Sequence, residues 1–150
     1  MIKTFKGKLN SDDAVRIRIG TKDGETGYKI RNLEIIGELP GQQTVELVTK
    51  VYTVPPEKDA TGAWDVDGAI DFNDPTLIAV AYLDDSSSTG TPFSHRIIMD
   101  NVKVNQDLYV TTLDVSGSSR ATNFYLEMEQ MKLAESEAAI ATLKDIRGRE

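Results

Sequence analysis

The stretch from Asn105 to Met131 constrains the fold of this chain more than any other. Two apolar runs flank the small polar residues 116–119, and this arrangement predicts a β-hairpin with a loop of several residues. Because side chains alternate along a strand, the second run is expected to turn one set toward a core: Phe124, Leu126 and Met128. The first run, around Leu108 and Val110, has apolar residues on both faces. We therefore expect it to be covered on both sides, by a second layer or by a neighbouring chain.

Other segments show the same kinds of strand signal. Alternation or a short apolar run predicts strands at residues 2–9, 15–19, 28–36, 43–54, 76–83 and 93–99. Residues 2–9 are expected at a sheet edge, and the continuous apolar run 76–83 is expected in a central strand buried on both faces. Asp23-Gly24 is a favoured turn pair between two of these strands. Many short strands predict a mainly β chain, and its 150 residues form one domain (1–150), an antiparallel β-sandwich or jelly-roll-like unit.

Two segments depart from the strand pattern. Residues 55–75 have no periodicity, and irregular segments of this length are usually functional or bind partners. They hold the only tryptophan, Trp64, which is either an interaction anchor or a lid over the edge of the core. Residues 133–147 are rich in helix formers and predict a short C-terminal helix. Its apolar stripe includes Leu143 and Ile146, which are candidate contacts because the stripe must dock on this domain or on a partner. A turn followed by one more strand is the alternative for residues 135–147.

Charge is distributed unevenly along the chain. Residues 1–31 hold eight Lys or Arg against four acids, whereas residues 32–100 hold three against twelve. A net charge of −7 argues against nucleic acid as a partner, since phosphate binding needs a basic surface. The basic side chains are candidate contacts to an acidic partner or to another copy of the chain: Lys3, Lys6, Lys8, Arg16 and Arg18. The alternative is that they are solvated and protect strand edges.

The residues with chemical potential form no recognisable reactive set. The chain has no cysteine and a single histidine, His95, so we expect no catalytic residue and no cofactor. Asp65, Asp67 and Asp71 lie close together around a glycine, as in a calcium loop, but the spacing of an EF-hand is not met. Turn formation explains the same residues, and the question of Ca²⁺ stays open. No apolar run is long enough for a membrane span or a signal peptide, so we expect synthesis in the cytoplasm and no membrane partner.

Four segments of the last third of the chain resemble a known protein family. In order they are residues 97–102 (IIMDNV), 105–111 (NQDLYVT), 123–129 (NFYLEME) and 141–147 (ATLKDIR). Together they resemble small structural proteins of marine tailed bacteriophages. A looser similarity covers Asp71 to Tyr82.

The resemblance implies a non-enzymatic component of the virion, such as a capsid decoration (cement) protein or a minor capsid protein. Such a protein is expected to self-associate as a homo-oligomer and to bind the major capsid protein or other virion proteins. It does not indicate whether the position is outside the capsid, inside it or at the tail. The alternative is a carbohydrate- or host-surface-binding β-module of a tail or fibre, using Trp64, Tyr28, Tyr52 and the acidic loop.

Overall fold

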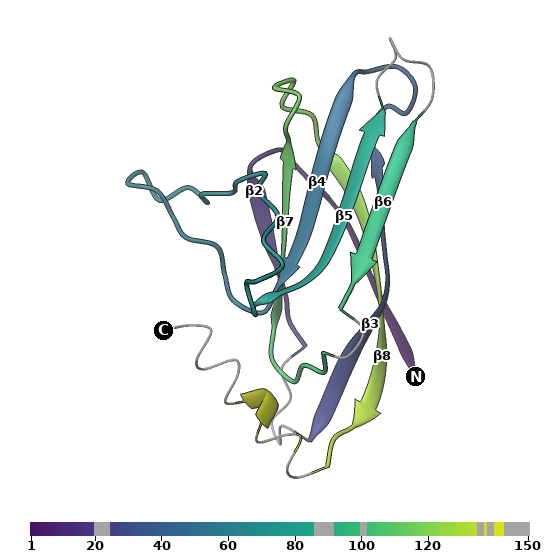
Figure 1. Cartoon of the computed structure of the whole chain (residues 1–150), viewed down its shortest axis with the longest axis vertical. Coiled ribbons are helices and arrows are strands. Elements are labelled where there is room, and N and C mark those ends of the chain that lie inside the picture. The colour runs from purple at the N-terminus through teal and green to yellow at the C-terminus, as the bar shows by residue number, and fades with distance from the viewer. Residues whose placement is uncertain (20–24, 86–91, 100–101, 135–136, 138–139, 143–150) are drawn as a thin grey trace.

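The strands of the computed structural model lie in two antiparallel sheets that face each other (Figure 1). The structure describes residues 1–19, 25–85, 92–99, 102–134, 137 and 140–142. Within them the strands are β1 (Ile2–Leu9), β2 (Asp13–Ile17), β3 (Thr26–Gly37), β4 (Val45–Tyr52), β5 (Leu77–Asp85), β6 (Phe93–Ile98), β7 (Leu108–Asp114) and β8 (Thr122–Lys132). The smaller sheet has the order β1-β8-β3 and the larger one β2-β7-β4-β5-β6. The predicted mainly β sandwich is confirmed.

Three strand pairs of this chain match those of an eight-stranded jelly roll, which is a double-sheet architecture built from two Greek keys. β1 pairs with β8, β2 with β7, and β4 with β5. The fourth pair of a jelly roll, β3 with β6, is altered here. β6 pairs with β5 instead, and it contacts β3 through an ion pair between Arg96 and Glu34. The chain is therefore a jelly-roll-like sandwich with β6 at one edge of the larger sheet.

The predicted hairpin over residues 105–131 is wrong, although both of its arms are strands. β7 lies between β2 and β4 in one sheet, and β8 lies between β1 and β3 in the other. The connection 115–121 is an arch that crosses from sheet to sheet. Alternation fixes which side chains of a strand face the core, but it does not choose the neighbouring strand.

The core lies between the inner faces of the two sheets. Leu33, Leu108 and Leu126 have no exposed surface, and Phe124 and Met128 are buried beside them, as the alternation in β8 predicts. Burial of such side chains stabilises the fold by about 1.5–3 kcal/mol each.

The core also contains a short chain of threonine hydroxyls. The Thr112 hydroxyl donates to Thr122 at 2.8 Å, and the Thr49 and Thr112 hydroxyl oxygens lie 3.2 Å apart. Thr49 and Thr112 belong to the larger sheet and Thr122 to the smaller, so this chain of hydroxyls connects the two layers.

The remaining expectations for individual elements are met in part. β1 is an edge strand, as predicted, and β7 is buried on both faces. β5 lies inside its sheet, and its first five residues are buried on both faces. Residues 137 and 140–142 are helical, which confirms a short C-terminal helix. The turn predicted at Asp23-Gly24 lies outside the described residues, and so do Leu143 and Ile146.

Within the described ranges, no helix has the length and apolar character needed to cross a membrane.

Candidate functional site

Residues 53–76, the connection from β4 to β5, lie over the outer face of the larger sheet (Figure 1). They contain no strand, which confirms the predicted irregular segment 55–75. The backbone N–H of Val66 donates to the Asp12 carboxylate, at 3.2 Å. Gly68 packs so closely on β7 and the start of the arch that a Cβ there would lie 2.6 Å from a methyl group of Val115. These contacts hold the segment, hereafter the strap, against the sheet.

Trp64 lies in a small turn at the outer end of the strap. Asp59 and Ala63 close this turn through a 2.8 Å backbone hydrogen bond, and Lys58 pairs with Trp64 in an isolated bridge. The Lys58 ammonium lies 4.6 Å from the centre of the Trp64 ring, in the geometry of a cation–π contact. Trp64 is half-buried. Its role as an anchor for a partner stays a prediction.

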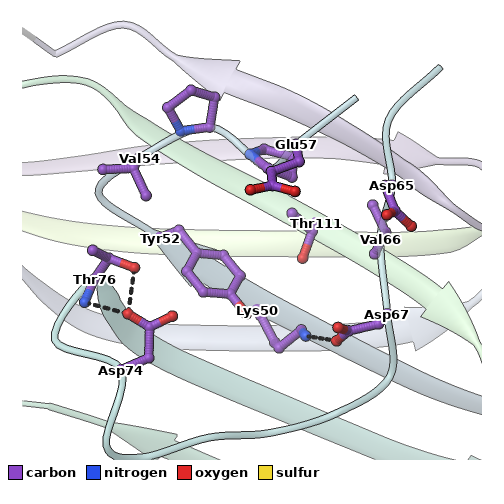
Figure 2. Close-up of a pocket in the computed structure, with 12 residues that line it drawn as sticks. Lys50, Tyr52, Val54, Glu57, Asp65, Val66, Asp67, Asp74, Thr76 and Thr111 are labelled. Carbon is purple, nitrogen blue, oxygen red and sulfur yellow. Dashed lines mark hydrogen bonds and ion pairs between the residues drawn. The ribbon is translucent and has the colours of Figure 1, made fainter. Parts of the chain in front are cut away.

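A cavity of about 560 Å³ opens between the strap and the sheet (Figure 2). Its floor comes from β4 and β7, whose outward side chains alternate with buried core residues. Its walls come from the strap. The lining residues are Lys50, Tyr52, Val54, Pro55, Pro56, Glu57, Asp65, Val66, Asp67, Asp74, Thr76 and Thr111.

Lys50 is the central cation of this cavity and is only 2% exposed. Its ammonium donates to the Ala69 carbonyl at 2.7 Å and to the Asp67 carboxylate at 3.1 Å. It also lies 5.5 Å from the centre of the Tyr52 ring. A buried charge is tolerated when it is paired and hydrogen-bonded, and here the strap supplies both partners. Lys50 therefore fastens the strap to β4.

The sequence analysis did not single out Lys50. The available signal was a lone lysine in the middle of a strand otherwise rich in Val and Thr. Its partner Asp67 was noticed for a different reason, as a member of the aspartate group considered for Ca²⁺.

The three aspartates of that group have separate roles. Asp67 pairs with Lys50, Asp65 lines the cavity, and the Asp71 carboxylate accepts from the backbone N–H of Asn73 at 2.9 Å in a local turn. No three metal-ligating side chains converge on one point anywhere in the described part of the chain. Asp71 therefore behaves as the turn-forming alternative predicts.

The basic residues of the first third of the chain do not form one patch. Lys6 and Lys8 project from the outer face of the smaller sheet, where Lys8 pairs with Glu38 at 2.9 Å. Arg16 lies on the outer face of the larger sheet and binds the Asp107 carboxylate, which raises the pKa of Arg16.

The other two basic candidates also lie apart. The Lys3 ammonium donates to the Tyr28 hydroxyl at 3.1 Å. Arg18 is exposed just beyond the end of β2.

A second surface lies at the edge of the larger sheet, and the sequence analysis did not identify it. Phe93, His95 and Ile97 alternate on β6 and face outward beside Tyr82 of β5. Phe93 is 52% exposed and Ile97 is 45% exposed, and the rings of Phe93 and His95 meet edge to face at 4.8 Å. These four residues are called the β6 strip. Their alternation was visible in the predicted strand 93–99, but its solvent-facing side was not.

Tyr82 is fixed at the inner border of the β6 strip. Its hydroxyl donates to the Glu46 carboxylate at 2.7 Å. This hydrogen bond, together with burial and the nearby negative charge, raises the pKa of Tyr82 to about 12. The ring therefore stays neutral and directed toward β4 over the usual pH range.

Comparison with known proteins returned no matching family model, no matching curated protein and no matching solved structure.

Proposed function

We propose that the protein is a non-enzymatic structural component of a bacteriophage virion, a capsid decoration or minor capsid protein that self-associates and binds the shell. Two features coincide to support this proposal. Residues 105–111 and 123–129, which carry much of the resemblance, contribute to β7 and β8. β7 lies in the larger sheet and β8 in the smaller one, and the arch connects them. The sandwich has jelly-roll-like pairing, an architecture that virion proteins use.

The β6 strip is the surface best suited to such contacts. It combines exposed aromatic and aliphatic side chains with a strand at the edge of its sheet. Open edges and exposed apolar groups invite pairing with another chain, and protein interfaces are enriched in aromatic residues. We infer that Phe93 and Ile97 contact a second copy or the capsid shell.

The direct test is the composition of purified virions. Mass spectrometry is expected to detect the protein in particles at a stoichiometry related to the symmetry of the shell. Its absence from particles of a phage that expresses it would contradict the proposal.

A second test addresses the surface. The double variant Phe93→Glu, Ile97→Glu is expected to weaken self-association or shell binding at least tenfold, while circular dichroism stays unchanged. Ile36→Glu is the matched control, because Ile36 is 52% exposed on the outer face of the other sheet. Unchanged association of the double variant would exclude the β6 strip as the contact surface.

The alternative, a carbohydrate- or host-surface-binding module, has fewer residues to support it. Tyr28 is only 3% exposed and offers no open ring face for stacking. Tyr52 lines the cavity, and the Lys58 ammonium lies over the Trp64 ring. A glycan array that shows binding abolished by Tyr52→Ala or Trp64→Ala would favour this alternative.

A further inference from the structure

The cavity under the strap has an excess of negative charge. Four carboxylates line it against one ammonium, and that ammonium, Lys50, is already paired with Asp67. Glu57, Asp65 and Asp74 form no ion pair with any described residue. One oxygen of Asp74 accepts from the backbone N–H and the hydroxyl of Thr76, at 2.9 and 2.7 Å, so only its other oxygen is open to a ligand. Glu57 and Asp65 are exposed at the mouth of the cavity, and carboxylates of one sign gathered there attract a cation.

A separate observation lies at the floor of the cavity. The Thr111 hydroxyl oxygen is buried and has no hydrogen-bond partner among the described residues, and Thr111 is 1% exposed. Thr111 is directly opposite Lys50 across the β4–β7 ladder and is among the side chains that line the cavity (Figure 2). A buried hydroxyl without a partner is uncommon in proteins and calls for a bound water or ligand atom.

The arrangement of the carboxylates defines the shape of the cation. Figure 2 shows Asp74 on the opposite side of the cavity from Asp65, with Glu57 above the floor. No three acidic side chains in the described residues approach closely enough to hold a metal ion. Separated carboxylates match a cation whose charges are also separated.

We propose that this cavity binds alkylammonium groups, with a linear diamine as the ligand that fits it best. One ammonium lies near Thr111 and the carboxylates of Glu57 and Asp65, and the other lies near Asp74. The alkyl chain lies along Tyr52, Val54 and the two prolines. This site is independent of the proposed role in a virion.

The probe is 1,4-diaminobutane, titrated into the full chain by calorimetry at low ionic strength. Binding is expected to weaken as salt is added, since exposed carboxylates are screened. Propylamine, which has one ammonium, is expected to bind at least fivefold more weakly. Equal affinity for the two amines would overturn the proposal. So would the absence of any binding heat with about 10 mM diamine, since that corresponds to a Kd weaker than about 10 mM.

Variants identify the groups responsible. Glu57→Gln and Asp65→Asn are each expected to weaken diamine binding several-fold, and Thr111→Val is expected to do the same without unfolding the chain. Valine has the shape of threonine, and the hydroxyl that it removes makes no hydrogen bond to the part of the chain that the structure describes. Asp59→Asn is the matched control, because Asp59 is an acid of the strap that does not line the cavity. Equal effects of Asp59→Asn and Asp65→Asn would show that only general charge is involved and would overturn the proposal.

The alkylammonium group has two possible sources, a free amine or a lysine of a second copy. Sedimentation analysis with and without 1,4-diaminobutane distinguishes them. Binding with no change in mass assigns the site to a free diamine, whereas release of monomers from an oligomer assigns it to a lysine of a neighbouring copy. Either result supports the site, and its failure would leave the virion proposal untouched.

Discussion

Asp114 is expected to be the most important charged residue for stability, because its carboxylate holds the arch between the sheets. It is 4% exposed. One carboxylate oxygen accepts from the Ser116 hydroxyl (2.6 Å) and from the backbone N–H groups of Ser116 (3.0 Å) and Glu46 (3.2 Å). The other oxygen accepts from the backbone N–H of Arg120, at 3.0 Å. The carboxylate therefore closes both sides of the connection between β7 and β8.

The perturbation is Asp114→Asn, which keeps the size of the side chain and removes one acceptor. The new amide group faces the Arg120 N–H, so at least one part-buried donor is left without a partner. A hydrogen bond to a charged group contributes about 1.5–3 kcal/mol, and the remaining bonds weaken when the charge is lost. We expect a loss of about 2–3 kcal/mol in the free energy of unfolding, or roughly 4–12 °C in Tm for a chain of this size.

Urea denaturation of both proteins at pH 7 measures this loss directly. The control is Asp59→Asn, since Asp59 makes the same kind of turn through Thr61 and Ala63 but is exposed. Its loss is expected to be clearly smaller. If the two variants lose equal stability, or if Asp114→Asn is neutral, burial of the carboxylate in the arch is not what stabilises the fold.

The same carboxylate predicts a pH dependence. Burial would raise the pKa of Asp114, but the hydrogen bonds from Ser116, Arg120 and Glu46 outweigh it and lower the pKa below the ordinary 3.8. Because the folded pKa is the lower one, the contribution of Asp114 is present above about pH 4 and is lost as the pH falls further. The difference in unfolding free energy between the natural chain and Asp114→Asn is therefore expected to shrink below pH 4. A difference that stays constant to pH 2 would contradict this assignment.

Three further predictions concern other parts of the fold. Leu126→Ala removes a fully buried side chain and is expected to lower the unfolding free energy by about 2–5 kcal/mol in a urea titration. Gly68→Ala forces a methyl group against Val115 and is expected to cost about 1–2 kcal/mol in the same assay; a neutral result would mean that the strap moves freely. Spectroscopic titration is expected to show Tyr82 ionising near pH 12, and Glu46→Gln is expected to lower this pKa toward 10. Because the folded pKa of Tyr82 is raised, its contribution to stability is complete below about pH 10 and is lost as the pH rises through 12.

Much of the fold follows from local sequence patterns. Alternation in residues 123–129 correctly placed Phe124, Leu126 and Met128 in the core. The apolar faces of residues 108–115 correctly predicted a strand covered on both sides, because such a strand cannot face water. These inferences depend only on the two-residue period of a strand.

Partner choice did not follow from the same patterns. The arch after β7 was taken for a hairpin, because a short polar connection looks the same whether it stays within a sheet or crosses between sheets. The arch is recognised from the partners of β7 and β8, which belong to different sheets, and its carboxylate Asp114 binds the distant Glu46 N–H. Long-range contacts of this kind leave no local signal.

The candidate site was predictable only as a region. The length of residues 55–75 marked the strap, and its acids were noted individually. Two floor residues of the cavity, Lys50 and Thr111, come from strands that lie side by side only after folding. The β6 strip has the same origin, since Tyr82 and Phe93 belong to neighbouring strands.

The threonine hydroxyls of the core carry a consequence for how the layers can move. Apolar side chains tolerate small sliding of one sheet over another, since dispersion contacts have little directional preference. A 2.8 Å hydrogen bond between Thr112 and Thr122 does not tolerate such sliding, because it weakens steeply with distance and angle. At the end of the sandwich where the arch is located, the two sheets are therefore expected to move together when a force acts on the outer face of one of them.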